Sequence, residues 1–236
     1  MPYYYYGFDP TYFLVIIGAV ICMIASARVK STYNKYSQYR SASGMTGAQA
    51  AQRILNSAGI YDVTIQHVSG NLTDHYDPRS RVLRLSETVC NVNSVAAVSV
   101  ACHEAGHALQ HAQNYAPLKM RNAIVPVVNL ASNLCWPLAI LGIVLLYNGS
   151  YIGDTLFNIA VIAMLAVILF HAVTLPVEFN ASSRALKQME ALRIVDDAEL
   201  PGAKKVLRAA AMTYVAALAA AIANLLRLLA IRGNRD

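Results

Sequence analysis

The stretch "SVACHEAGHALQHAQ" (Ser99–Gln113) places several titratable side chains on one predicted helix of an otherwise apolar chain. His103, Glu104 and His107 form the pattern H-E-x-x-H, in which residues four apart lie on the same face of a helix. Two imidazoles at this spacing can bind one zinc ion, and the adjacent glutamate can act as general base toward a water molecule that zinc activates. The stretch therefore predicts the zinc helix of a small α+β domain.

A catalytic zinc ion needs a third protein ligand and one open position. His111 continues the four-residue step, but it lies about two turns from His103, so we expect it beside the site or at the surface. Glu178 is the best candidate, because a carboxylate at the end of an apolar run is costly unless it is paired or bound to a metal. The alternative for this residue is a hydrated glutamate at the start of a helix. The rival ligands are His171, Asp196 and Asp197.

Small and polar neighbours indicate how such a site is supported. Gly106 lies inside the motif, where glycine costs a helix about 1 kcal/mol relative to alanine, so we expect another element to pack closely against it. Asn180 and Ser182 follow Glu178 and can orient ligands by hydrogen bonds. The alternative for the whole motif is the solvated polar face of an ordinary helix.

The composition indicates a mostly α-helical membrane protein. Hydrophobic residues make up 56% of the 236 residues and charged residues only 14%, whereas soluble domains are about one quarter charged. The net charge of +6 comes from lysines and arginines that cluster beside apolar runs, which favours an anionic membrane surface over nucleic acid. The cysteines form no C-x-x-C pair, so we expect free buried thiols at Cys22, Cys90, Cys102 and Cys135.

Apolar runs mark the membrane segments. Residues 12–27, 124–147 and 152–177 predict transmembrane helices, and an alanine-rich run at 209–226 either spans as well or lies at the interface. Tyrosines in "PYYYYGF" are expected at the membrane surface before the first run. Pro126 and Pro137 predict kinks, and Pro176 predicts a kink or the start of a new helix.

Basic residues set the predicted orientation. Arg28, Lys30, Lys35 and Arg40 follow the first run, so its C-terminal end is expected in the cytoplasm and the N-terminus outside. The second and third runs form a hairpin with basic residues at both outer ends. The zinc helix and Glu178 are therefore expected on the cytoplasmic side of the cell membrane.

The polar region at 41–122 reads as the catalytic domain. Thr46 and Gln49 form a capping box for a helix over 47–58, and Asn93 or Ser94 caps the zinc helix, which should end near Gln113. Strands at 63–68 and 81–86, with a turn at 77–80, predict a short antiparallel sheet.

Peptide substrates often add to an exposed sheet edge, and we expect Val82–Leu85 to offer one. A plain hairpin strand with one buried face is the alternative. His75, Tyr76, Arg184 and Tyr214 are candidate partners for the charge that develops during catalysis.

Four segments follow from this pattern. We expect an interfacial segment and transmembrane helix at 1–28, a cytoplasmic metallopeptidase core at 29–123, a transmembrane hairpin at 124–177, and a third-ligand helix, basic loop and apolar helix at 178–236.

Several stretches resemble the YugP-like family of membrane zinc metallopeptidases. They are "LTDHYDPRSRVLRLSE", "HEAGHALQHA", "PLKMRNAIVPV", "TLPVEFNASSRAL" and "GAKKVLRAAAMTYVAA", and the resemblance extends from about Tyr33 to Leu229. More distantly, the chain is similar to HtpX-like membrane peptidases, which pair H-E-x-x-H with a distal glutamate.

The resemblance implies a fold and a ligand set. It implies a zincin-like domain in which His103, His107 and Glu178 bind zinc and Glu104 acts as general base. HtpX-like proteins carry aspartate four residues after the ligand glutamate, whereas this chain has Ser182, so the groups that support the ligands differ.

Together these observations predict a membrane-anchored endopeptidase that uses one zinc ion per chain and acts on peptides or proteins beside the lipid bilayer. One alternative is a catalytically silent scaffold or binding protein that keeps the zinc fold. The other is a structural membrane protein without metal. The presence of Glu104 favours the enzyme over the scaffold, because a silent site needs no base.

Overall fold

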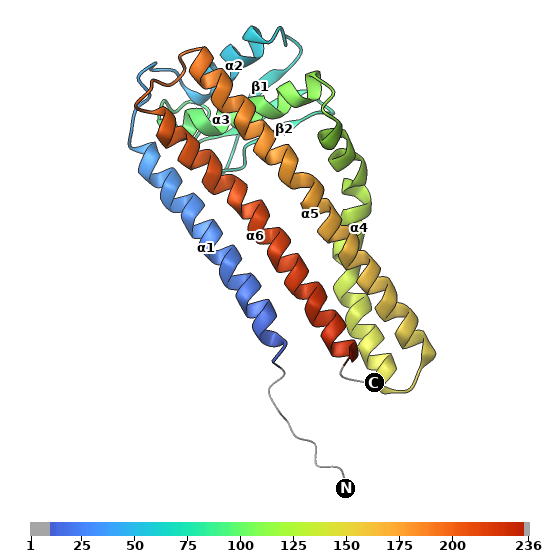
Figure 1. Ribbon diagram of the computed structural model, residues 1–236. Helices are drawn as coiled ribbons and strands as arrows, with labels where there is room; N and C mark the ends of the chain where they lie inside the picture. Colours follow the sequence, from blue (N-terminus) through green and yellow to red (C-terminus); the bar gives the residue numbers. More distant parts are fainter. Residues whose placement is uncertain (1–9, 234–236) are drawn as a thin grey trace. The chain divides into compact units, whose positions relative to one another are not determined.

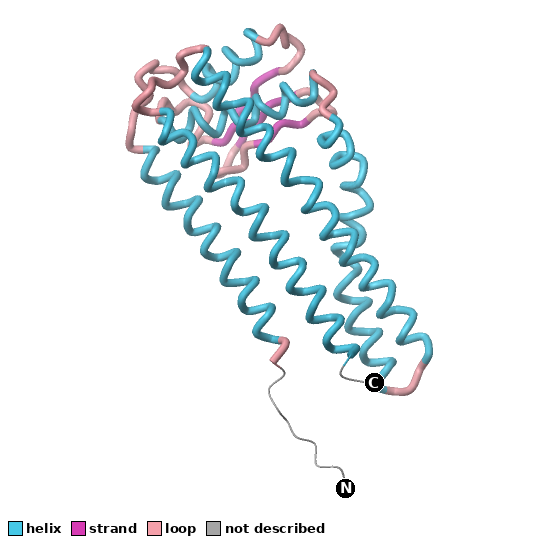
Figure 2. Tube along the Cα trace, viewed as in Figure 1, coloured by secondary structure: helices cyan, strands magenta, loops and turns pink. Residues whose placement is uncertain are grey.

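The computed structural model describes residues 10–233, so the tyrosines of "PYYYYGF" lie outside the described residues. Helices dominate, and Figure 1 traces them along the chain. Figure 2 shows the short strands as the remaining regular structure. In chain order the elements are α1 (Tyr12–Ser37), α2 (Gly47–Ser57), β1 (Thr64–Val68), β2 (His75–Asp77), β3 (Val82–Ser86), α3 (Val95–Ala112), α4 (Ala116–Tyr147), α5 (Tyr151–Ala191) and α6 (Leu200–Gly233).

The chain divides into two units. The first contains the described residues up to Ile24, residues 124–172 and the described residues from Val215 onward. The second contains residues 25–123 and 173–214. Helices α1, α4, α5 and α6 each contribute to both units, because the chain enters the second unit within α1 and α5 and leaves it within α4 and α6.

The first unit consists of helical segments that pack through apolar and small side chains. Phe157 of α5 is fully buried in a cluster with Cys135 of α4 and Leu228 of α6. Helices α1, α4, α5 and α6 are each long and apolar enough to cross a membrane, with mean hydropathies of 1.9 to 2.5 in their most apolar windows. The fourth apolar run therefore belongs to a helix that can span, like the first three.

The helices continue through their prolines. Pro126 and Pro137 lie inside α4, and Pro176 lies inside α5, which runs unbroken from Tyr151 to Ala191. The expectation that a new helix starts near Pro176 is wrong. Membrane helices tolerate proline because neighbouring groups satisfy the freed backbone carbonyl, and the continuous helix carries Glu178.

The second unit has an apolar core around α3. The predicted capping box of α2 is present: Thr46 accepts a hydrogen bond from the Gln49 amide, and the Gln49 side chain accepts one from Thr46. Ser94 caps α3, as predicted, by accepting from the Ala97 amide. Ile54 and Leu55 of α2 are fully buried in a cluster that also contains side chains of β3, α3, α5 and α6. Both faces of α3 are therefore covered.

The three-stranded sheet has the order β1-β3-β2. β3 pairs in parallel with β1, from Thr64 opposite Val82 to Val68 opposite Ser86, and antiparallel with β2. The two predicted strands correspond to β1 and β3, which pair in parallel, so the prediction that they form an antiparallel sheet is wrong. The predicted turn at 77–80 joins β2 to β3, and β2 itself escaped prediction because three residues give no alternating pattern.

The expected substrate edge is also wrong. Val82–Leu85 belongs to the central strand, which has a neighbour on each side. The parallel partner β1 occupies one side of β3, after a connection of 13 residues (69–81) that contains β2. The free edges of the sheet belong to β1 and β2.

Candidate metal centre

Helix α3 presents His103 and His107 one turn apart. Their ring centroids lie 4.8 Å apart with an interplanar angle of 81°. His107 is buried, with 8% of its surface exposed, and the His103 side chain is 14% exposed. The two rings therefore meet one space that is largely closed to solvent.

Glu178 reaches this space from α5. Glu178 is 2% exposed, and its carboxylate lies in reach of both rings. A close crossing of the helices makes this possible, because a Cβ on Gly106 would lie 2.5 Å from the backbone oxygen of Ala181. The expectation that an element packs tightly on Gly106 is confirmed, and that element is the helix that carries Glu178.

The three side chains have the spacing of a metal site. Glu178 Oε2 lies 3.3 Å from His103 Nε2 and 3.6 Å from His107 Nε2. Ligands bonded at about 2.0–2.1 Å to one tetrahedral ion are about 3.3 Å apart. Among the described residues these side chains form the one group of three or more histidines, cysteines or carboxylates whose ligand atoms converge, all within 4.8 Å. Two imidazoles and one carboxylate fit a zinc ion that keeps an open position.

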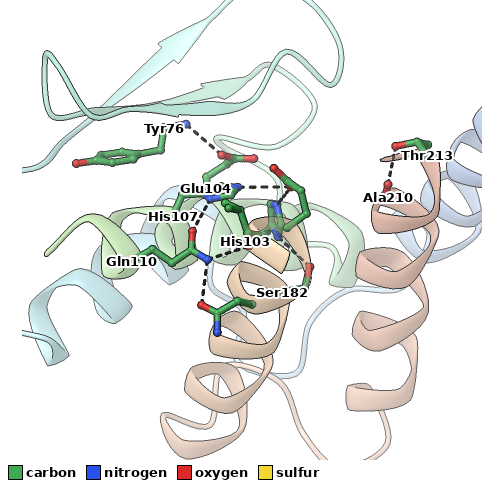
Figure 3. Close-up of polar contacts among 11 residues, drawn as sticks. Tyr76, His103, Glu104, His107, Gln110, Ser182, Ala210 and Thr213 are labelled. Atoms are coloured by element: carbon green, nitrogen blue, oxygen red, sulfur yellow. Dashed lines mark hydrogen bonds and ion pairs between the residues drawn. The ribbon is translucent and has the colours of Figure 1, made fainter. Parts of the chain in front are cut away.

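The outer nitrogen of each ring has an oxygen partner. Ser182 Oγ lies 3.1 Å from His103 Nδ1, and Gln110 Oε1 lies 3.0 Å from His107 Nδ1 (Figure 3). When each Nδ1 donates its proton to that oxygen, each Nε2 keeps the lone pair that a metal requires. The arrangement therefore fixes both rings in the tautomer and the orientation suited to a shared ion.

Gln110 is the site residue that the sequence analysis missed. It is fully buried, and its amide nitrogen donates to the Val177 backbone oxygen at 2.8 Å and to Asn180 Oδ1 at 3.0 Å. Asn180 Oδ1 also accepts from Arg184 Nε at 2.6 Å. The one available signal was a glutamine three residues after a predicted ligand, which on a helix lies on the same side as that ligand.

Glu104 lies beside the centre without belonging to the converging group. Its Oε2 accepts a hydrogen bond of 3.1 Å from the backbone amide of Tyr76 in β2 (Figure 3). This bond fixes one carboxylate oxygen and leaves the other available. Because the Tyr76 amide bonds Glu104, the free edge of β2, opposite the edge that pairs with β3, faces α3.

Charge in the centre favours cations. Burial lowers the pKa of His107, but hydrogen bonding to Glu178 and the charges of Glu104 and Glu178 outweigh burial, so the pKa is raised overall. Two carboxylates thus draw positive charge into the space between the rings. A divalent ion placed there meets the same attraction.

Two cavities adjoin the centre within the second unit. One of about 110 Å³ is lined by His103, Glu104, His107 and Glu178 together with Tyr76 and neighbouring residues. Another of about 220 Å³ is also lined by His103, Glu104 and Glu178 and is otherwise mostly apolar, with side chains from α1 and α6. Tyr214 lines both cavities. A chain that crosses the centre could therefore place side chains in either cavity.

The remaining predicted residues take other roles. His111 Nδ1 lies 2.8 Å from the Tyr76 hydroxyl, which places it beside the site. His75 lines the smaller cavity, and its Nδ1 lies 2.9 Å from the Thr73 backbone oxygen. Asp196 accepts from the Glu199 amide in the loop before α6. In the described part of the chain, the rivals His171, Asp196 and Asp197 are absent from the converging ligand group.

Comparisons with known proteins show similarity to a zinc metallopeptidase family and to a membrane protease. A family model described as "Putative neutral zinc metallopeptidase" matches residues 11–233. The chain is 47% identical over 219 residues to "Putative membrane protease YugP" of Bacillus subtilis (strain 168), which covers 93% of this chain and 95% of that protein. No solved structure matches the chain.

Proposed function

We infer the function from one premise: the chain belongs to the zinc metallopeptidase family whose model matches residues 11–233. On that premise we propose that it is a membrane-anchored, zinc-dependent endopeptidase. One observation carries the proposal, namely the convergence of His103, His107 and Glu178 on one point with Glu104 beside them. The helices that can cross a membrane anchor the site.

In the proposed mechanism, His103, His107 and Glu178 hold one zinc ion. Zinc, when bound, supplies Lewis acidity that activates water and polarises the carbonyl of the scissile peptide bond. Ser182 and Gln110 hold the two imidazoles in place through Nδ1. These hydrogen bonds keep both rings fixed while the charge in the centre changes during the reaction.

Glu104 acts as the general base. It follows a metal-binding residue directly, so its carboxylate lies beside the open position of the site. The Tyr76 amide holds one of its oxygens, and the other accepts the proton of the attacking water. The same carboxyl group then delivers this proton to the nitrogen of the departing amine.

The substrate lies along β2. This strand is at the edge of the sheet, and the Tyr76 amide faces the metal centre. An extended peptide can pair with the backbone of such an edge, apart from the Tyr76 amide, which bonds Glu104. The mostly apolar cavity beside His103 and Glu178 then accepts an apolar side chain that flanks the scissile bond.

The orientation of the chain follows from its basic residues. Lys30 and Lys35 in the second half of α1, and Arg184 and Lys187 near the end of α5, belong to the unit that contains the centre. The positive-inside rule assigns this unit to the cytoplasm and the N-terminus to the outside. Substrates are therefore cytoplasmic proteins or the cytoplasmic segments of membrane proteins.

A zinc-containing scaffold without turnover is the competing function. It shares the ligand set and the supporting hydrogen bonds, so metal analysis does not separate it from the enzyme. Glu104 does, because a scaffold has no use for a base at this position.

The test compares wild-type protein with Glu104→Gln and Glu178→Gln. Glu104→Gln should keep about one zinc ion per chain while peptide cleavage falls by 10³-fold or more, about the upper range for loss of an acid–base group. Glu178→Gln should lose zinc and activity together. Cleavage is read from new peptide termini in cells that contain each variant. Equal termini with wild-type and Glu104→Gln protein would refute the enzyme and favour the scaffold.

A further inference from the structure

A groove outside the metal centre runs between α5 and α6 within the second unit. Its volume is about 630 Å³. Lys187, Lys204 and Arg208 supply its charge, and Phe179 and Leu186 are among its apolar lining residues. The proposed peptidase mechanism uses none of these side chains.

The cations of the groove are exposed and lack carboxylate partners. Lys187, Lys204 and Arg208 are all exposed, and none of them forms an ion pair with another residue in the described range 10–233. Glu190 is the one carboxylate in the lining, so three positive charges and one negative charge leave a net +2. A concave surface with this charge attracts anions.

Phe179 and Lys187 lie at different positions along the groove. Phe179 follows the apolar run of α5 by two residues and is 45% exposed. Lys187 lies eight residues farther along the same helix, about 12 Å at 1.5 Å per residue. On α6, Lys204 and Arg208 precede the apolar run at 209–226. Along α5, Phe179 is therefore about two turns closer to the end of the apolar run than Lys187 is.

We propose that this groove binds an anionic phospholipid, with the phosphate between Lys187, Lys204 and Arg208 and the start of an acyl chain against Phe179 and Leu186. A lipid matches both ends of the groove. An acidic peptide matches the cations but leaves the exposed Phe179 without a partner. The site is separate from the peptidase reaction, so the proposal holds whether or not the chain cleaves peptides.

The groove adjoins the metal centre at Ser182, and it shares Leu207 and Ala211 with the larger cavity beside the centre. Ser182 lines the groove, and the Ser182 hydroxyl lies 3.1 Å from His103 Nδ1. A lipid that fixes this part of α5 also fixes the partner of His103. Because coupling between two binding sites is reciprocal, bound lipid should raise the affinity for zinc, and bound zinc should raise the affinity for lipid.

The test measures retained lipid by native mass spectrometry. The full chain is purified in detergent and titrated with phosphatidylglycerol or phosphatidylcholine. Two groove variants are compared, Lys204→Gln/Arg208→Gln and the single variant Lys187→Glu. The matched control is Arg53→Gln/Lys205→Gln, which removes the same charge from exposed positions outside the groove lining. Thermal unfolding verifies that each variant is folded.

Phosphatidylglycerol should bind wild-type protein more tightly than phosphatidylcholine. The affinity should fall about 30-fold in Lys204→Gln/Arg208→Gln, because each basic residue near a lipid surface contributes about 1 kcal/mol. The control should bind like wild type. An equal loss in the control would overturn the proposal, since general surface charge would then explain binding.

Two competition arms separate other occupants. Displacement of the lipid by millimolar inorganic phosphate, without any effect of the acyl chain, would reassign the groove to free phosphate. Displacement by an acidic peptide at lower concentration than phosphatidylglycerol would reassign it to a polypeptide. Either result overturns the lipid proposal. If Glu104→Gln left cleavage unchanged, the proposed peptidase would fail, but the results of these two lipid competitions would still stand.

Discussion

Glycine lets helices approach closely in both units of the molecule, at Gly106 in the second unit and at Gly142 in the first. A Cβ on Gly106 would lie 2.5 Å from the Ala181 oxygen, and a Cβ on Gly142 would lie 2.8 Å from the Phe157 nitrogen. Around Gly142 the neighbours are apolar, and Phe157 is 1% exposed. Around Gly106 the neighbours are the groups that define the candidate metal centre.

The same steric device therefore has different consequences. Near Gly142, a small shift of α4 against α5 exchanges one set of apolar contacts for another. Near Gly106, the separation of α3 and α5 sets the distances of 3.3 Å and 3.6 Å between Glu178 and the two imidazoles. Metal sites require ligand distances to hold within about 0.2 Å. The distance between α3 and α5 should thus affect metal binding, whereas the distance between α4 and α5 at Gly142 should affect only the stability of the fold.

The largest effect should come from alanine at these glycines. Gly106→Ala should lose most of its zinc, lower kcat/KM by about 100-fold or more, and destabilise the fold by about 1–3 kcal/mol through overpacking. Gly142→Ala should show a similar loss of stability and retain about one zinc ion per chain. Metal analysis and thermal unfolding in one detergent give both quantities. The comparison breaks if Gly142→Ala also strips zinc, or if Gly106→Ala keeps it.

A smaller effect is expected from the hydrogen bonds that Gln110 makes between α3 and α5. Gln110→Leu keeps the side-chain volume but leaves His107 Nδ1, the Val177 oxygen and Asn180 Oδ1 without this partner. Zinc affinity should fall about 10- to 100-fold, the usual range for residues that orient a ligand. A chelator competition measures it.

Gln113→Leu is the control for this variant, because the exposed Gln113 accepts from Arg184 and contacts neither histidine. Its zinc affinity should match that of wild type. Equal affinities for Gln110→Leu and wild type would show that close packing at Gly106 suffices to hold the imidazoles.

Local signals in the sequence predicted much of this second unit. Thr46 was identified as a helix cap because Gln49 lies three residues away, and Ser94 was one of two candidate caps for α3. The expected proximity of Glu178 to the zinc helix rested on chemistry, since a lone carboxylate beside an apolar run needs a partner. The structure brings these groups together, and their role as metal ligands stays a prediction.

Non-local features escaped prediction. The direction in which β1 runs beside β3 depends on contacts between distant residues. A parallel pair was therefore mistaken for an antiparallel one. The partners of Gln110 lie 67 and 70 residues away on another helix. Pro176 was misleading because its local preference is overridden inside a long apolar helix.

The smallest effect is expected in the turn between β2 and β3, away from both glycine contacts. The Asp77 carboxylate accepts hydrogen bonds from the Ser80 hydroxyl at 2.6 Å and the Arg79 amide at 3.0 Å. These bonds, with a contribution from Arg84, lower the pKa of Asp77 to about 2. A lowered pKa means that the folded turn favours the ionised form.

The stabilisation by Asp77 should therefore be present above about pH 4 and disappear as the pH falls from about 4 to about 2. Asp77→Asn should remove this pH dependence and change little else, because the side chain is 30% exposed and the interactions are local. Hydrogen exchange of the amides at 75–86, corrected for the intrinsic rate, measures it. Metal-free protein serves for both variants, because acid removes zinc from either. If Asp77→Asn also weakened zinc binding at neutral pH, the turn would be coupled to the centre through Tyr76 and Glu104. The sheet would then belong with the contacts that affect metal binding, not with those that affect stability alone.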